Sequence, residues 1–377
     1  MYKNLLTVLF ISLSFNAQSE TKEKMQQALN SLVELIPVIT NDEAFKAKQN
    51  EAKIQKEIDN LQKAFKQAGH ERLVRQDVFA PSYTIMNEYL ADAQKAFKKG
   101  NKDYANWRLK EITNTCLDCH TRMPVDHPSS FRQGQKQLNT SNISDPYNRG
   151  IVQLVVRLYP EAKATFTSLI DQKLIKNDIR DLDLPFKQLL MIQTKVLKDP
   201  EDMMKINEHY LAKKNLPEDT KKLLTLWNKD LKPWTFNRSL KNRLNNDKEV
   251  AELISKNVKP AFKEESFYSG DSEVSLLFSS GLLSNYLFEN TGSPMAPEIM
   301  YWLGISEKYL LRDRFFGAGD QFLKLCIRRY PKSDFAPKCL REYKESIEFE
   351  FSGSRGTDIP EDVEKELKGL EQLIKTK

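Results

Sequence analysis

The chain has 377 residues, of which 29% are charged and 40% hydrophobic, an ordinary balance for a globular protein. Its length predicts about two domains. The net charge of +6 is modest, and the chain has neither a concentrated basic tract nor a recognisable reader motif, so a nucleic-acid-binding role has no support. Only 13 residues are glycine, and helix formers such as Lys, Leu, Glu, Gln and Ala dominate. We therefore expect an all-α protein.

Residues 1–19 have the pattern of a cleavable secretory signal peptide. An apolar run from Leu5 to Phe15 follows a lysine, and Ala17 and Ser19 are the small residues expected before the cleavage point. The run is too short to span a bilayer, and no cysteine follows it that could carry a lipid. We expect an exported, periplasmic protein with no stable membrane anchor.

Residues 20–125 are predicted to form a four-helix domain, because apolar residues recur along them at steps of three and four. Asn41 is a typical helix cap, Gly69 is a typical helix stop, and Pro37 should kink or end the first helix. The predicted helices run from Met25 to Ile39, from Asn41 to Gly69, from Pro81 to Gly100 and from Ala105 to Cys119. Their short connections imply antiparallel neighbours.

The fourth predicted helix ends in the motif Cys116-Leu117-Asp118-Cys119-His120, which occurs once in the chain. Two thiols at this spacing, followed directly by a histidine, are the attachment signal of a c-type haem. The two thiols can add to the two vinyl groups of one porphyrin, and the imidazole can then bind the iron. Both cysteines continue the apolar stripe of the helix and so face the bundle interior. We expect one covalent haem c, attached at Cys116 and Cys119, with His120 as the proximal iron ligand.

The same residues have three other interpretations: a structural zinc half-site, a thioredoxin-like dithiol and a chance disulfide. Zinc requires about four ligands, and the remaining cysteines, Cys326 and Cys339, are distant in the sequence. A redox dithiol would be expected at a strand-to-helix turn, and nothing around residue 116 has a strand pattern. Haem attachment is therefore favoured.

Met25 is the residue that we expect on the distal side of the iron. It lies on the core-facing stripe near the start of the first helix, and antiparallel alternation places that start beside the end of the fourth helix. A thioether is a good iron ligand opposite an imidazole, although plain core filling is the alternative. The competing candidates are Met86, His70, Met123 and His127, and His209 is expected to be a solvated helix residue of the next domain.

Residues 21–122 resemble the class II cytochromes c, which include cytochrome c prime and low-spin four-helix cytochromes, and are similar also to the periplasmic b-type four-helix cytochromes. The resemblance rests on the motif at 116–120 with Arg122 after it, on the helix entry at 100–105 and on residues 23–25. It implies a left-handed bundle that carries electrons. In the low-spin members a methionine at the position of Met25 is the sixth ligand, whereas the cytochrome c prime branch has an apolar residue there and binds small gases. Those families are typically single-domain proteins, whereas this chain continues for about 250 residues.

Residues 126–144 are rich in Ser, Asn, Gln and Pro and are predicted to be a linker. Residues 145–377 are predicted to form helix pairs, first at 147–158 with 160–174 and then at 184–197 with 200–211. Residues 296–352 resemble tetratricopeptide repeats, through Tyr301-Trp302-Leu303-Gly304, Ala318 with Phe322, and Tyr330-Pro331 before Ala336-Pro337. The resemblance implies an α-solenoid, with residues 365–375 as its polar capping helix.

A stack of helix pairs presents a concave surface, so we expect this domain to dock a redox partner protein, with shelter of the haem domain as the alternative. Cys326 and Cys339 lie on consecutive predicted helices. In an oxidising compartment they could form a disulfide, or they could remain buried thiols.

Together these features predict a periplasmic monohaem c-type cytochrome that transfers electrons through His/Met-ligated haem and is not an enzyme. The alternative is a haem-based gas or redox sensor, with a five-coordinate or labile sixth site, that signals through the repeat domain. A peroxidase is less favoured, because catalysis needs an open iron with a polar distal acid or base, and only one haem motif is present.

Overall fold

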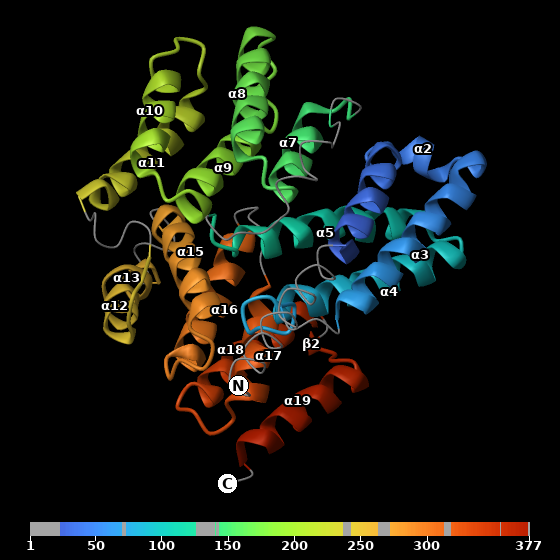
Figure 1. Cartoon of the computed structure of the whole chain (residues 1–377), viewed down its shortest axis with the longest axis vertical. Helices are drawn as coiled ribbons and strands as arrows, with labels where there is room; N and C mark the ends of the chain where they lie inside the picture. Colours follow the sequence, from blue (N-terminus) through green and yellow to red (C-terminus); the bar gives the residue numbers. More distant parts are fainter. Residues whose placement is uncertain are drawn as a thin grey trace, which may run out of the picture. The chain divides into compact units, whose positions relative to one another are not determined.

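The computed structural model describes residues 23–69, 73–125, 140, 143–236, 243–262, 272–312, 318–354 and 356–375. Nearly all regular structure in these ranges is helical (Figure 1), and the strands among them are β1 (Ser352–Gly353) and β2 (Gly356–Thr357), which pair antiparallel. The prediction of an all-α protein is confirmed. The predicted signal peptide at 1–19 and most of the predicted linker at 126–144 lie outside the described residues.

The chain divides into two compact units. The first unit comprises residues 1–120 and 126–169, and the second unit comprises residues 121–125 and 170–377. This division differs from the predicted boundary at 126–144, because α7 (Pro146–Val155) and the start of α8 (Tyr159–Ile175) belong to the first unit. The physical reason is packing within that unit, where Val155 contacts His120 near the end of the haem-motif helix.

In the first unit, residues 23–39 form a helix that continues through Pro37. The elements that follow are α2 (Asp42–Lys46), a 3-10 turn (Lys48–Asn50), α3 (Glu51–Ala68), α4 (Ala80–Lys98) and α5 (Lys102–Thr121). Asn41 caps α2 as predicted, since its side-chain oxygen accepts a hydrogen bond from the Ala44 amide at 3.0 Å. Helices α3 and α4 pack against each other.

The second predicted helix is not continuous, which corrects the expectation from the sequence. The backbone is extended at Ala47 (φ −65°, ψ 128°), and the side-chain amide of Asn50 donates to the Ala44 carbonyl at 2.7 Å across the break between α2 and α3. This break leaves Phe45 fully buried and edge-on to Phe97, with ring centroids 5.6 Å apart. Burial of the aromatic ring offsets the helical hydrogen bonds that are lost at the break.

The second unit is a sequence of helices with two π-helical turns. Its elements are α9 (Asp183–Met191), the π-helix Ile192–Val196, α10 (Pro200–Leu211), α11 (Glu218–Phe236), α12 (Asp247–Leu253), the π-helix Ile254–Val258, α13 (Lys259–Ala261), α15 (Glu273–Glu289), α16 (Ala296–Arg312), α17 (Gly319–Arg329), α18 (Ala336–Glu350) and α19 (Glu361–Lys375). Helices α16, α17 and α18 pack consecutively, and α19 packs on α17 and α18.

Helix α15 is not among the elements that the sequence patterns predict. Buried residues occur on every side of it, so no amphipathic period marks it. It packs against α11, α16 and both π-helices. The approach to the first π-helix is close, because a Cβ added at Gly281 would lie 2.2 Å from the Lys195 carbonyl oxygen. Helix α15 is therefore a central core helix of the second unit.

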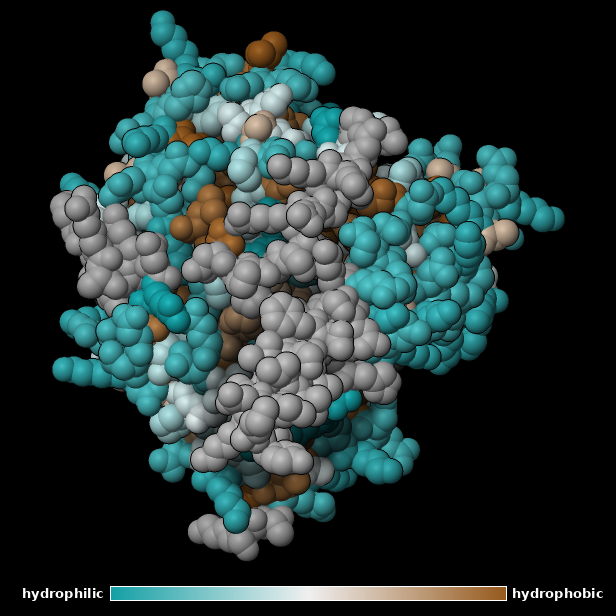
Figure 2. All heavy atoms as spheres, in the orientation of Figure 1, coloured by the Kyte–Doolittle hydropathy of each residue, from teal (hydrophilic) through white to brown (hydrophobic). Residues whose placement is uncertain are grey.

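On the face shown in Figure 2, hydrophilic residues cover most of the area that the described residues occupy, and hydrophobic residues show between them in small groups. Within the described ranges, no helix combines the length and the apolar character needed to cross a membrane.

Candidate functional site

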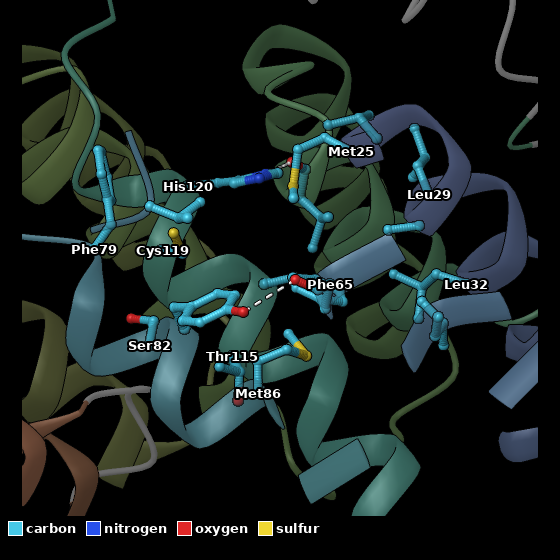
Figure 3. A pocket seen from close by; sticks show the side chains of 17 residues that line it. Met25, Leu29, Leu32, Phe65, Phe79, Ser82, Met86, Thr115, Cys119 and His120 are labelled. Carbon is cyan, nitrogen blue, oxygen red and sulfur yellow. Dashed lines mark hydrogen bonds between the residues drawn. The ribbon is translucent and has the colours of Figure 1, made fainter. Parts of the chain in front are cut away.

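Helix α5 carries the predicted haem motif along one wall of a cavity in the first unit (Figure 3). The space among the lining side chains, including the part open to solvent, is about 660 Å³. The other walls come from helix 23–39, α3, α4 and the end of α7. An apolar lining is supplied by Leu29, Leu32, Leu61, Phe65, Phe79 and Met86.

The structure brings the four sequence-predicted site residues to this cavity. Cys116, Cys119 and His120 line it from α5, and Met25 lines it from the helix 23–39. Since Met25 is more than 90 positions from the motif in the chain, their meeting depends on how the helices pack. The arrangement is the one expected when the start of the first helix lies beside the end of the haem-motif helix.

The His120 imidazole is held by a backbone carbonyl. Its Nδ1 makes a hydrogen bond with the Val155 carbonyl oxygen at the end of α7. Because a carbonyl can only accept, Nδ1 carries the hydrogen and Nε2 is left in the form that binds a metal. Burial lowers the pKa of His120, and the charge of Arg157 lowers it further, although the bond to Val155 acts in the opposite direction. The imidazole is therefore neutral near pH 7, as metal ligation requires.

The two motif cysteines lie one helical turn apart on α5 and are not joined by a disulfide. Burial raises the pKa of the Cys116 thiol to about 12, and the neighbouring Cys119 adds to this rise. A thiol with such a pKa is protonated near neutral pH, so it is a poor nucleophile in the folded chain. Cys116 therefore lacks the lowered thiol pKa that is typical of a catalytic dithiol.

Two methionines line the cavity. Met25 is partly exposed, whereas Met86 on α4 is buried. In Figure 3 the Met25 sulfur points toward the His120 ring, and Met86 lies nearer to Thr115. Of the other predicted candidates, His70 and His127 lie outside the described residues, and Met123 and His209 belong to the second unit and do not line the cavity.

Tyr83 is a cavity residue that the sequence analysis did not identify. Its hydroxyl donates a hydrogen bond to the Phe65 carbonyl at 3.1 Å. The ring reaches this position only because residue 69 is glycine, since an added Cβ would lie 1.9 Å from the Tyr83 hydroxyl oxygen. Gly69 ends α3 as predicted, but its close approach to Tyr83 is a long-range contact with no local sequence signal.

Asp118, between the two cysteines of the motif, is also buried. It accepts a hydrogen bond of 2.8 Å from the hydroxyl of Ser82, in the first turn of α4. A buried hydrogen bond to a charged acceptor is stronger than a neutral one. The bond therefore ties the motif segment of α5 to the start of α4.

Among the described residues, no three Cys, His, Asp or Glu side chains gather as a protein-only metal site would require. Cys326 on α17 and Cys339 on α18 are fully buried thiols of the second unit, with no disulfide between them. Burial raises the pKa of Cys339, as does its hydrogen bond with Cys326. Of the two forms expected for this pair, a disulfide or buried thiols, this structure has the buried thiols.

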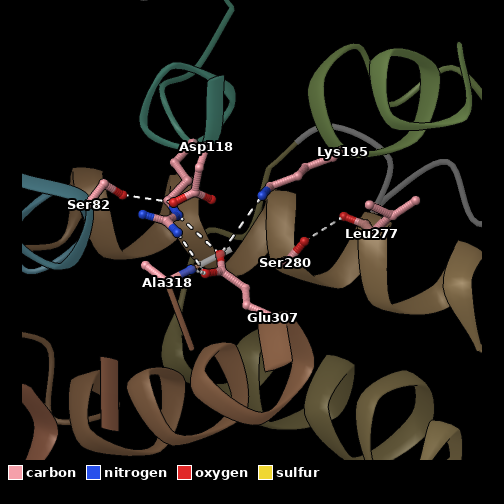
Figure 4. A network of polar contacts seen from close by, with 8 residues as sticks. Ser82, Asp118, Lys195, Leu277, Ser280, Glu307 and Ala318 are labelled. Atoms are coloured by element: carbon pink, nitrogen blue, oxygen red, sulfur yellow. Dashed lines mark hydrogen bonds and ion pairs between the residues drawn. The ribbon is translucent and has the colours of Figure 1, made fainter. Parts of the chain in front are cut away.

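Two residues beyond His120, Arg122 is fully buried in the second unit. Its guanidinium pairs with Glu307 through two contacts of 2.6 and 3.1 Å, and its Cζ lies 4.7 Å from the Phe322 ring centroid. Glu307 also accepts a bond of 2.7 Å from the Ala318 amide and lies 3.8 Å from the Lys195 ammonium (Figure 4). A buried, multiply bonded pair of this kind fixes the segment 121–125 in the second unit.

Comparisons with known proteins found no match: no family model, no curated protein and no solved structure matches this chain.

Proposed function

We propose that this protein is an exported, periplasmic monohaem c-type cytochrome that carries electrons. Cys116 and Cys119 would hold one haem through thioether links, and His120 and Met25 would be its axial ligands. When bound, the haem supplies one-electron chemistry, because its iron alternates between the ferrous and ferric states. The observation that carries the proposal is that two thiols, a thioether and an imidazole in its metal-binding tautomer line one apolar cavity.

The protein's own residues would have three tasks in this function. The apolar lining, including Leu29, Leu61 and Phe65, excludes water from the iron. The Val155 carbonyl fixes the orientation of the His120 ring. Packing between helices holds the two axial side chains on separate elements of one rigid unit, so that little reorganisation would accompany each electron transfer.

We further propose that the first unit is a four-helix bundle of the class II cytochrome type, and that the second unit contains a tetratricopeptide-like α-solenoid. Support for the solenoid comes from the consecutive packing of α16, α17, α18 and α19. The partner would be a redox protein that docks on these helices, since stacked pairs present a concave surface.

The first experiment is expression in a host that matures c-type cytochromes, followed by optical and mass spectra. We expect a covalent mass increase of one haem and low-spin bands with a methionine-to-iron charge-transfer feature. Met25→Leu should abolish that feature, because it removes the thioether while keeping the volume of the side chain. Met86→Leu is the matched control from the same cavity and should leave the feature unchanged.

A colourless mature protein, with both motif thiols still open to alkylation, would overturn the proposal. High-spin bands and rapid carbon monoxide binding in the unchanged protein would instead favour the gas or redox sensor. Loss of the charge-transfer feature in Met86→Leu, with its retention in Met25→Leu, would exchange the roles of the two methionines.

A further inference from the structure

The carbonyls at the end of α7 have different partners. Those of Val152, Gln153 and Leu154 accept hydrogen bonds from amides of the turn that ends the helix. The carbonyl of Val155, the last residue of α7, accepts from the imidazole of His120. The side chain of Val155 also lines the cavity. The position of α7 therefore determines where the acceptor of the His120 hydrogen bond lies.

Helix α7 is seated on α8 by contacts within the first unit. A Cβ added at Gly150 would lie 2.6 Å from two ring carbons of Phe166, so the approach of the two helices requires a glycine. The Phe166 ring is fully buried, and its centroid lies 5.8 Å from that of Tyr147. The Thr165 hydroxyl donates to the Gln153 side chain at 2.8 Å. Since positions 147, 150 and 153 follow at steps of three, these contacts hold one face of α7 against α8.

The bond from His120 to the Val155 carbonyl affects any metal that the imidazole binds. A ring that donates a hydrogen bond through one nitrogen is a stronger electron donor through the other. Hydrogen bonds of this kind change the reduction potential of an iron site, and a stronger donor favours the ferric state. A hydrogen bond also weakens when its distance or angle leaves a narrow range. A displacement of α7 would therefore weaken the bond and favour ferrous iron.

We propose that the contact between Gly150 and Phe166 seats α7 so that its last carbonyl holds the His120 ring and keeps the reduction potential of the iron low. The inference rests on the proposed function. It makes Gly150 and Phe166 positioning residues, which act on the iron through Val155 and His120. It also explains a glycine inside α7, where glycine weakens a helix relative to alanine.

The test compares full-length, haem-loaded variants whose haem content and low-spin spectra match the unchanged protein. Gly150→Ala overfills the seat, and Phe166→Leu underfills it. We expect each to shift the equilibrium toward ferrous iron at least threefold, which is a midpoint potential higher by about 28 mV at about 59 mV per tenfold change for one electron. The Nδ1 proton of His120, followed by NMR in the ferrous protein, should exchange with solvent at least about tenfold faster.

Combining the two substitutions separates seating from general loosening. In the double variant the added methyl group takes up space that the ring has left, so α7 should return to its seat and both measurements should move back toward the unchanged protein. Two independent losses of packing would instead add. Gly369→Ala, which has open space around it on α19 of the second unit, is the matched glycine control and should change neither measurement.

Unchanged potential and proton exchange in the single variants would overturn the inference while leaving the proposed function intact. So would a double variant whose shifts are the sum of the single ones. If Gly150→Ala does not fold, Phe166→Leu decides by the same two measurements. A mature chain that carries no haem would overturn the proposed function, and exchange of the His120 proton would then still show whether the contact between α7 and α8 holds the ring.

Discussion

Burial sets the charge state of the reactive side chains in the cavity. The pKa of His120 is lowered and that of Cys116 is raised, in each case chiefly by burial, so both are neutral near pH 7. Neutral groups suit the apolar lining around them, because an isolated charge there would lose its hydration. Burial disfavours the charged form of each group. The charged form of His120 is the protonated imidazolium, so its pKa falls, whereas the charged form of Cys116 is the thiolate, so its pKa rises.

The raised pKa of Cys116 gives a prediction for the chain made without haem. An ordinary thiol is about one-tenth thiolate at pH 8, whereas a thiol with a pKa of about 12 has on the order of one part in ten thousand. Since only the thiolate reacts, iodoacetamide should modify Cys116 at least tenfold more slowly in the folded chain than in urea. Peptide mass spectrometry measures both rates.

The pH dependence provides the control for that experiment. In the folded chain the rate should still be rising tenfold per pH unit between pH 8 and 10, whereas in urea it should level off near pH 9. The unfolded thiol ionises before the folded one, so the folded state binds more protons above pH 9 and its stability falls as the pH rises. Equal rates in the folded and unfolded chains would show that the fold does not shield the Cys116 thiol.

Helices α16 and α17 approach each other closely, and their contact requires a glycine on each helix. A Cβ at Gly319 would lie 2.6 Å from the Gly304 carbonyl oxygen, and a Cβ at Gly304 would lie 2.7 Å from a methyl carbon of Leu323. The first neighbour is backbone and cannot move without shifting the helix. Two small residues therefore set the distance between the helices.

Gly319→Ala should destabilise the second unit by about 1–3 kcal/mol, because the new methyl group has no space. Gly369→Ala, on the exposed side of α19 with open space around it, is the matched control and should stabilise its helix by up to about 1 kcal/mol. Urea unfolding followed by tryptophan fluorescence measures both. A loss of stability in Gly369→Ala equal to that in Gly319→Ala would contradict the packing argument.

Sequence periodicity predicted those elements that have one buried face. The helices at 23–39, α3, α4 and α10 follow the expected stripes, and Gly100, with φ 80°, ends α4 as a left-handed residue. Helix α15 escaped prediction because it is buried all round. The contact between Val155 and His120 was not predicted, because any residue type can supply a backbone carbonyl and the two positions are 35 apart in the chain.

For the whole molecule, we expect the two compact units to unfold in separate events. In the second unit, α15 packs against α11, α16 and two π-helices. The first unit contains an apolar cavity that, under the proposed function, the haem occupies. A ligand that binds only the folded form stabilises the unit that holds it.

The double variant Cys116→Ser with Cys119→Ser, which cannot attach haem, should therefore loosen the first unit alone. Hydrogen exchange resolved by peptide should become at least tenfold faster in α3 and α4, a loss of about 1.4 kcal/mol of protection. Exchange in α15 and α17 should stay within twofold of the haem-loaded protein, because the core that buries those helices is made by the second unit itself. An equal rise in α15 would show that the two units unfold as one, and that the attachment site stabilises the entire chain.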